Sequence, residues 1–229
     1  MDNNEQKILD ILKAKSKTKQ LVYDNTLLAF NVLKEVLQET VENMNNALGD
    51  DDDDRISLNY RDKGIFEAEI KVAADIIVFN MHSNIFEFEN SHNIWKTTYV
   101  KKDKLNSYCG VINIYNFLSD SFKYNRLNDV GYLIGRLFIN KDNFYFVEGK
   151  RQMGFLYNEF GSKKINKEEL KSIIESAILY SLEFDLLVPP YDRVSQVSIA
   201  QIVDRINHSK VKTGKRLGFQ FSASDTDEL

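Results

Sequence analysis

The chain has 229 residues, of which 43% are hydrophobic and 12% aromatic, with 30 Lys and Arg against 34 Asp and Glu. A chain of this length can bury about 70–75% of the surface that its unfolded form exposes, and its single cysteine excludes both an intrachain disulfide and a zinc site built from several cysteines. The net charge of −4 argues against a protein whose whole surface binds polyanions, although it leaves room for a local basic patch.

The N-terminus shows no basic segment followed by an apolar core, so the sequence does not predict a secretory signal. No apolar run approaches the roughly 20 residues of a membrane-spanning helix. A single cysteine is typical of a reducing compartment. We therefore expect a cytoplasmic protein with no membrane partner.

Residues 5–48 carry apolar side chains at a spacing near 3.6, which predicts helix. Asp2 and Glu5 form the pattern of a capping box at its start, and the lysine-rich stretch 13–19 predicts a break or a polar turn between two helices. The second helix has an apolar stripe that covers more than one face, so another surface must cover it. Two alternatives remain open: packing on the sheet of the same domain, or a homodimer face formed by residues 20–48.

Gly49 and the five aspartates at 50–54 end the helical pattern, because adjacent carboxylates repel one another and are unfavourable beside the negative end of a helix dipole. A calcium site is the functional alternative, but the alternating ligands and the turn glycine of an EF-hand loop are missing, so we expect no metal there. The loop divides an N-terminal helical segment (1–49) from an α+β domain (55–221). A disordered tail is expected at 222–229.

Beyond the acidic loop the apolar period changes to two, which predicts half-solvated antiparallel strands that pair in the order of the sequence. A turn at 62–64 joins the first two strands. The expected strands of this part are 56–61, 66–72, 75–81, 84–89 and 96–101.

The stretch 111–126 is ambiguous, since its β-branched residues favour a strand while its apolar residues also recur at helical spacing. We interpret it as a helix inserted between strands. Strand patterns return at 131–139 and 143–149 and, more weakly, at 153–158.

Two helices are expected near the end of the chain. Asn166 and Glu169 form a second capping box, which opens an apolar helical face. Pro189 and Pro190 stop the regular pattern. The last helix is expected at 195–207, with the inward side chains Val197, Ala200, Val203 and Ile206.

This order of elements predicts an α+β fold with N-terminal helices, a central antiparallel sheet with one inserted helix, and C-terminal helices. Profilin-like, PAS-like and GAF-like sensor folds use a similar order. The similarity is one of order alone, because no motif residues support it.

Few side chains offer catalytic chemistry. Cys109 is the only thiol, and it would need His82 or His92 beside it in space to act as a nucleophile. Free cysteines are often buried, so a structural role is favoured, with a redox-sensitive thiol as a further alternative. Glu67 and Glu69 project from one face of a strand, where a solvated sheet surface explains them better than acid–base catalysis.

His82 and His92, with Asp75, Glu87 and Glu89 nearby in the sequence, come nearest to a set of metal ligands. The two histidines lack the i, i+4 spacing that places paired imidazoles on one helical face. We therefore expect turn or edge residues that form local hydrogen bonds, and neither a metal nor a cofactor.

The end of the chain is locally basic. Its cations are compatible with contacts to phosphate or single-stranded nucleic acid, or with a protein partner. A solvated tail, or one that pairs with the acidic loop, explains the same charges. The candidate binding residues are Arg205, Lys210, Lys212, Lys215 and Arg216.

Aromatic residues are concentrated between 79 and 157, which is compatible with a core and with an aromatic-lined ligand pocket. We expect a cytoplasmic, non-catalytic binding or regulatory protein that acts as a protein-interaction scaffold, through self-association or another protein, or as a small-ligand sensor. Nucleic-acid binding through 205–216 is one alternative. An enzyme with a site in the aromatic-rich middle is the other.

Overall fold

The computed structural model describes residues 2–49, 56–149, 160–184, 188, 190–203 and 206. Several sequence predictions lie outside the described residues. These are the acidic loop at 50–54, the strand at 153–158, the tail at 222–229 and the basic residues Arg205, Lys210, Lys212, Lys215 and Arg216.

The N-terminal helices form one continuous helical run. It comprises α1 (Asn3–Ile11), the π-helical turn η1 (Leu12–Ser16) and α2 (Lys17–Leu48). The capping box of Asp2 and Glu5 is confirmed, but the predicted break or turn at 13–19 is wrong. Lysine is a good helix former, so a lysine-rich stretch need not interrupt a helix. Gly49 ends the run with a φ of +85°, a conformation that favours glycine.

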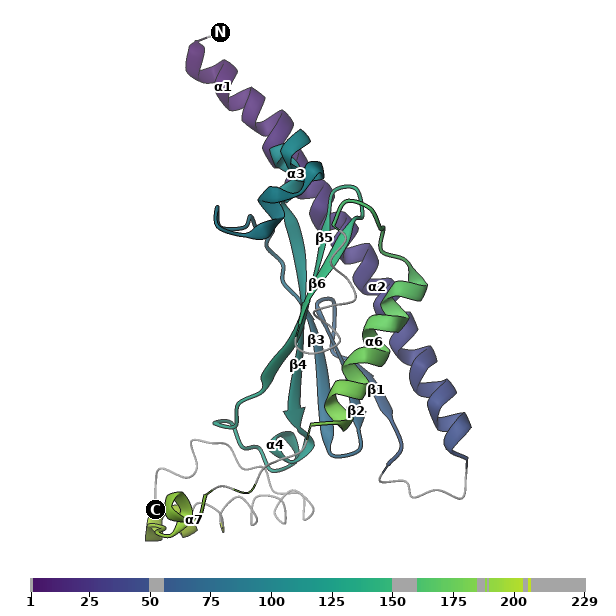
Figure 1. Cartoon of the computed structure of the whole chain (residues 1–229), viewed down its shortest axis with the longest axis vertical. Coiled ribbons are helices and arrows are strands. Elements are labelled where there is room, and N and C mark those ends of the chain that lie inside the picture. Colours follow the sequence, from purple (N-terminus) through teal and green to yellow (C-terminus); the bar gives the residue numbers. More distant parts are fainter. Residues whose placement is uncertain are drawn as a thin grey trace.

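Among the described residues, six antiparallel strands form one sheet, and each strand pairs with its neighbours in the sequence. The hairpins β1–β2 and β5–β6 pair as predicted, whereas the pairing of β3 with β4 was not predicted. Short turns join β1 to β2, β2 to β3 and β5 to β6, which keeps these neighbours adjacent. Figure 1 shows the twisted sheet beside the long helix. The strands are β1 (Asn59–Asp62), β2 (Glu67–Val72), β3 (Asp75–Met81), β4 (Cys109–Leu118), β5 (Tyr132–Asn140) and β6 (Tyr145–Gly149).

Helices α2 and α6 (Lys167–Leu182) lie side by side on one face of the sheet (Figure 1). Asn166 caps α6, because its side-chain oxygen accepts a hydrogen bond of 2.8 Å from the Glu169 amide. The apolar stripe of α2 is covered within the molecule, as the first alternative expects. The main core contains Phe30, Leu33, Leu37, Ile70, Ile77, Phe79, Ile112, Ile114, Leu137, Ile139, Ile173 and Ile174.

The helix predicted at 111–126 is wrong for most of its length, because β4 runs to Leu118 and only α4 (Ser119–Lys123) is helical. Both faces of β4 are covered: Ile112 lies in the main core, and Val111 lies in a second cluster on the opposite face. Both odd-numbered and even-numbered positions of β4 therefore carry apolar residues. Periodicity alone does not distinguish such a strand from a buried helix.

The strands predicted at 84–89 and 96–101 are also wrong. The structure describes this whole stretch, in which Phe86 forms only an isolated bridge with Cys109. Instead, β4 pairs antiparallel with the free edge of β3. The connection between these two strands, residues 82–108, passes over the open face of the sheet, and we call it the crossover for that reason. This crossover contains η2 (Asn93–Lys96), α3 (Thr98–Lys102) and η3 (Lys104–Ser107).

The crossover covers a second, smaller apolar cluster on the face opposite α2. Side chains alternate between the two faces of a strand, so Phe138 and Phe146 point away from the main core. Four partly buried aromatic rings pack against the cluster, which consists of Ile94, Val100, Cys109, Val111, Phe138 and Phe146, with Phe88, Trp95, Tyr99 and Phe160 around it.

The last helical residues do not contribute to the core. A short helix, α7 (Tyr191–Val194), precedes a further helical stretch at 199–203. The four side chains predicted to point inward are exposed. Val197, Val203 and Ile206 are 49%, 47% and 48% exposed. In Figure 1, α7 lies beyond the end of the sheet, away from both covered faces. That inward prediction is therefore wrong.

A close approach between α2 and β4 generates the first test. A Cβ added at Gly110 would lie 2.1 Å from Thr26 Oγ1 and 2.8 Å from Thr26 Cβ. We expect Gly110→Ala to lower the free energy of unfolding by roughly 1–3 kcal/mol, because the helix must move away from the sheet. Urea denaturation measures the change.

A double variant controls for the cause. Thr26→Ala removes the nearest atom, so the combined Gly110→Ala/Thr26→Ala change should cost less than the sum of the two single changes. Gly110→Ala with the stability of the wild type would contradict the close packing.

Candidate functional site

A pocket of about 350 Å³ opens beside the second cluster. Its walls come from the crossover, where η2 begins, from strand β6, and from Phe160 in the segment after β6. The described lining residues are His92, Asn93, Ile94, Thr97, Phe146, Glu148 and Phe160.

Aromatic rings form the apolar part of the pocket. The Phe146 ring stacks on Phe138, with centroids 4.8 Å apart, and meets Phe160 edge to face at 5.2 Å. On the crossover side, Phe88 stacks on the His92 ring at 4.5 Å. Each ring is held by a neighbour, so the apolar wall is preformed.

Glu148 is the polar centre of the pocket. Its carboxylate lies 2.9 Å from His92 Nε2 and 2.5 Å from Arg136 Nη2. His92 Nδ1 accepts the Ile94 amide at 3.2 Å, so the proton of a neutral His92 lies on Nε2, which donates to Glu148. Both ring nitrogens are engaged. His92 therefore orients Glu148 and the loop, and it has no free nitrogen to serve as a base.

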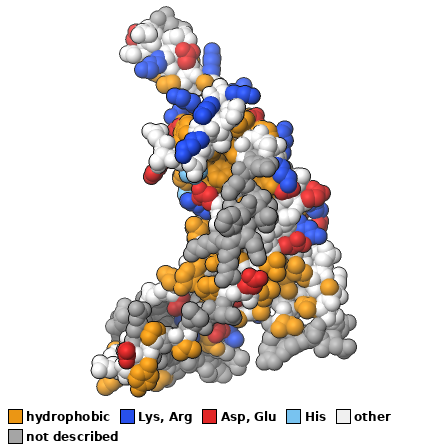
Figure 2. Space-filling model, in the orientation of Figure 1, with side chains coloured by type: hydrophobic (Ala, Val, Ile, Leu, Met, Phe, Trp, Pro, Cys, Tyr) orange, Lys and Arg blue, Asp and Glu red, His pale blue; other side chains and the backbone are white. Residues whose placement is uncertain are grey.

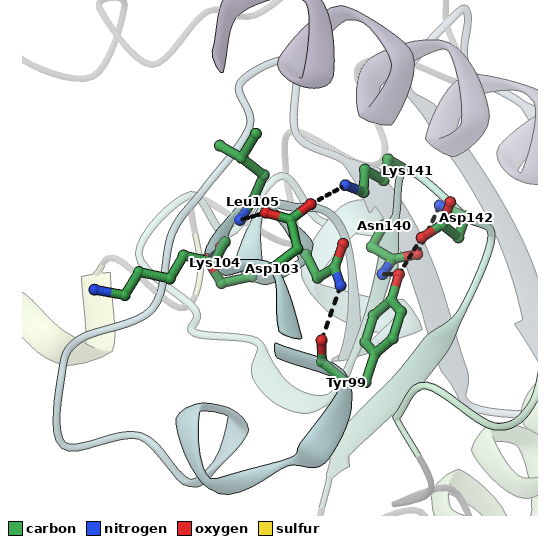
Figure 3. A network of polar contacts seen from close by, with 9 residues as sticks. Tyr99, Asp103, Lys104, Leu105, Asn140, Lys141 and Asp142 are labelled. Atoms are coloured by element: carbon green, nitrogen blue, oxygen red, sulfur yellow. Dashed lines mark hydrogen bonds and ion pairs between the residues drawn. The ribbon is translucent and has the colours of Figure 1, made fainter. Parts of the chain in front are cut away.

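A hydrogen-bond network holds the crossover against the β5–β6 turn (Figure 3). The Tyr99 hydroxyl donates to the Asp142 carboxylate and accepts a bond of 2.9 Å from Asn140 Nδ2. Asn140 Oδ1 accepts the amides of Asp142 and Phe144, both at 3.0 Å. Burial, aided by the bond to Asp142, raises the pKa of Tyr99, so the hydroxyl stays protonated and keeps donating.

Further bonds tie the same turn to the rest of the molecule. Lys141 Nζ lies 2.6 Å from Asp103 Oδ2, and this bond lowers the pKa of the Asp103 carboxyl. Asn25 of α2 donates to the carbonyls of Asn140 and Lys141 at 3.2 and 2.7 Å. The crossover, the hairpin turn and the long helix therefore form one support for the pocket.

Cys109 has the structural role that the sequence favours, and both histidines form local or ion-pair contacts. Cys109 is fully buried, and burial raises the pKa of its thiol, which suits the structural role. His82 Nδ1 accepts the Asn84 amide at 3.0 Å, the local turn bond that the sequence predicts. Among the described residues, no three His, Cys, Asp or Glu side chains gather into a cluster that could hold a metal.

The predicted solvated face of β2 needs a correction. Glu69 is only 4% exposed, and its carboxylate lies 3.2 Å from Arg61 Nη1 and 3.5 Å from Lys63 Nζ. The carboxylate is buried but neutralised, so it is not available as a free acid or base. Glu67 forms a longer bond, 3.4 Å from Asn80 Nδ2.

Sequence reasoning missed Glu148 and Arg136, which lie far from His92 along the chain. A signal for this pair was present. The sequence predicts both strands and the turn between them, and the hairpin register places Arg136 opposite Glu148 and Phe138 opposite Phe146. A hairpin whose polar face carries an opposed ion pair beside two phenylalanines marks a possible site.

A second hollow, of about 400 Å³, lies at the far end of the sheet and contains Asp75 and Asn116. Asp75 Oδ1 is buried and has no hydrogen-bond partner among the described residues. Burial raises the pKa of this carboxyl, and a hydrogen bond with Asn116 offsets only part of the effect.

Comparison with protein families, with curated proteins and with solved structures finds no significant match for this chain. These comparisons give the sensor-fold analogy no support, and the helix at 111–126 that was part of the expected order is mostly strand β4. In the part of the chain that the structure describes, no helix has the length and apolar character needed to cross a bilayer.

Asp75 generates a pH-dependent prediction. Its raised pKa in the folded state gives stability below the ordinary value of 3.8, and this stability is lost as the pH rises through the folded-state pKa. We expect Asp75→Asn to be more stable than the wild type near pH 7, by at most about 1 kcal/mol, because solvent still screens this partly exposed carboxyl.

Thermal unfolding of both proteins between about pH 3.5 and pH 7 measures the difference. The two stability curves should diverge as the pH rises. Parallel curves over this range would show that the Asp75 carboxyl titrates alike in the folded and unfolded chains.

Proposed function

We propose that the protein is a non-catalytic binding protein that holds a small molecule in the pocket between His92 and Glu148. The observation that carries the proposal is the joint presence of preformed aromatic rings and one oriented carboxylate in a hollow of about 350 Å³. Ligand pockets commonly have volumes of about 300–1,000 Å³ and combine apolar walls with a few fixed polar groups. A regulatory role in the cytoplasm fits such a site.

The chemistry of the pocket favours an uncharged, aromatic or heteroaromatic ligand. Arg136 balances the charge of Glu148, so the site has no excess charge to attract an ion. Phe146 and Phe160 offer apolar contact for a planar ring. A carboxylate that already accepts two hydrogen bonds still has lone pairs for a ligand N–H or O–H.

Binding in preference to catalysis is supported by the state of the reactive groups. The two nitrogens of His92 are engaged, and the thiol of Cys109 is buried. A general base or a nucleophile needs a free lone pair within reach of a substrate. The Glu148 carboxylate does keep such lone pairs, but its charge is balanced by Arg136. The pocket is therefore better suited to holding a molecule than to changing it.

Tryptophan fluorescence tests this proposal, because Trp95 is the only tryptophan and packs against the second cluster. A panel of indole, adenine and nicotinamide serves as the probe set. Asn93 is exposed at the pocket, so Asn93→Phe should obstruct it and weaken binding at least about tenfold.

Ser91→Phe is the matched control, since it adds the same ring to the same loop at an exposed residue that does not line the pocket. It should bind as the wild type does. If no probe changes the fluorescence, or if Asn93→Phe binds as tightly as Ser91→Phe, the assigned pocket is wrong.

Self-association is a second candidate function, which the surface of α1 favours. Helix α1 has no buried residue. Ile8 and Ile11, together with Leu12 at the start of η1, are 56%, 48% and 53% exposed. Their spacing places them on one side of the continuous helical run. Exposed apolar side chains at this spacing form a surface that a second copy of the chain could cover. The self-association surface proposed here is thus residues 3–16 instead of 20–48, whose stripe packs on the sheet.

Light scattering tests this second candidate. The wild type should be a dimer, and Ile8→Glu/Ile11→Glu should be a monomer, because it places charges in the apolar contact. Leu28→Glu changes a residue of α2 that is 64% exposed, and it should leave the dimer intact. A monomeric wild type would exclude a dimer through α1.

A further inference from the structure

A large groove lies on the open face of the sheet, at the end opposite the crossover. It measures about 840 Å³ and runs between the β2–β3 turn and α4. Its floor is apolar, with Ala73, Ala74, Ile76, Leu118 and Phe122. None of these residues lines the pocket between His92 and Glu148, so the groove is independent of the proposed function.

Four cations surround this floor: Arg61, Lys71, Lys123 and Arg126, with Asp120 as the one described carboxylate in the lining. Arg61 is partly neutralised by Glu69 at 3.2 Å, and Arg126 lies 3.9 Å from Asp129. Neither Lys71 nor Lys123 forms an ion pair with a described carboxylate. The groove is thus locally positive on a chain whose net charge is −4.

Phe122 adds an aromatic surface to the groove. Its ring meets Phe117 edge to face, with centroids 5.4 Å apart, and the residue remains 49% exposed. The ring of Tyr124 is already occupied, because Lys123 and Arg126 lie 5.6 and 5.2 Å from its centre. Phe122 therefore presents the aromatic surface that remains for a bound group.

We propose that this groove binds an organic phosphate, that is, a multiply charged anion attached to an apolar or aromatic group. Guanidinium and ammonium groups are strong donors to phosphate oxygens, and several cations around one hollow repel one another until an anion neutralises them. The apolar floor and Phe122 take the organic part. An inorganic anion would use the cations and leave the floor empty.

Calorimetric titration with four probes tests the proposal: inorganic phosphate, adenosine, ADP and a single-stranded oligonucleotide. ADP should bind at least about tenfold more tightly than phosphate or adenosine, since only ADP satisfies the cations and the floor together. The oligonucleotide should show no tighter binding than ADP.

Two variants remove the same charge at opposite ends of the molecule. Lys71→Gln/Lys123→Gln should weaken ADP binding at least about tenfold. Lys101→Gln/Lys102→Gln removes two lysines of α3, where basic side chains also gather (Figure 2), and should change the affinity less than about twofold.

Each other outcome overturns the proposal. If both variants weakened ADP binding equally, the loss would come from the general charge of the protein and not from this groove. If ADP bound no more tightly than phosphate, the apolar floor would have no role in binding. If ADP did not bind at all, the groove would not be a site for organic phosphates. Tighter binding of the oligonucleotide, falling steeply with salt, would identify a nucleic-acid surface in its place.

Discussion

The packing of α2 against one face of the sheet is the constraint on which the other features depend. Gly110 and Thr26 bring β4 and the helix into direct contact, and Leu33 and Leu37 lie fully buried in the core that results. With α6 beside it, α2 covers one face of the sheet. The opposite face must then be covered by something else, because Val111, Phe138 and Phe146 on that face are apolar.

The crossover at 82–108 provides that cover over one end of the open face only. It is held by the Tyr99 and Asn140 network and by the pair of Asp103 and Lys141, so its position does not depend on apolar contact alone. This partial cover leaves a pocket at the edge of the crossover and leaves the other end of the face open. The two sites that we propose lie on this face, and both draw side chains from rigid strands, which favours fixed geometry.

The sequence was informative where one face of a strand is solvated, and it misled where both faces are covered. In β1 and β2, alternation of apolar and polar residues identified the hairpin, although Glu69 is buried by its ion pairs. In β4, apolar residues on both faces of the strand also recur at helical spacing, so the stretch was interpreted as a helix. The stretch 84–101 has strand-forming residues, but the Thr97 side chain accepts the Val100 amide and so caps the N-terminus of α3. The strand interpretation overlooked this N-cap signal.

The candidate site was only partly accessible from sequence for a different reason. Aromatic enrichment was compatible with a pocket as well as with a core, but the contact of His92 with Glu148 joins residues 56 positions apart. Only the hairpin register relates Glu148 to Arg136, and only the path of the crossover brings His92 to them. Such contacts depend on tertiary topology, which local propensity does not encode.

Native mass spectrometry of the gently purified protein tests the central claim, that the pocket beside Phe146 holds a small molecule. The account predicts a subunit mass increased by one small organic molecule in the wild type, and the bare mass in Asn93→Phe. A wild type that carries no added mass, or a variant that retains the same molecule, would contradict it.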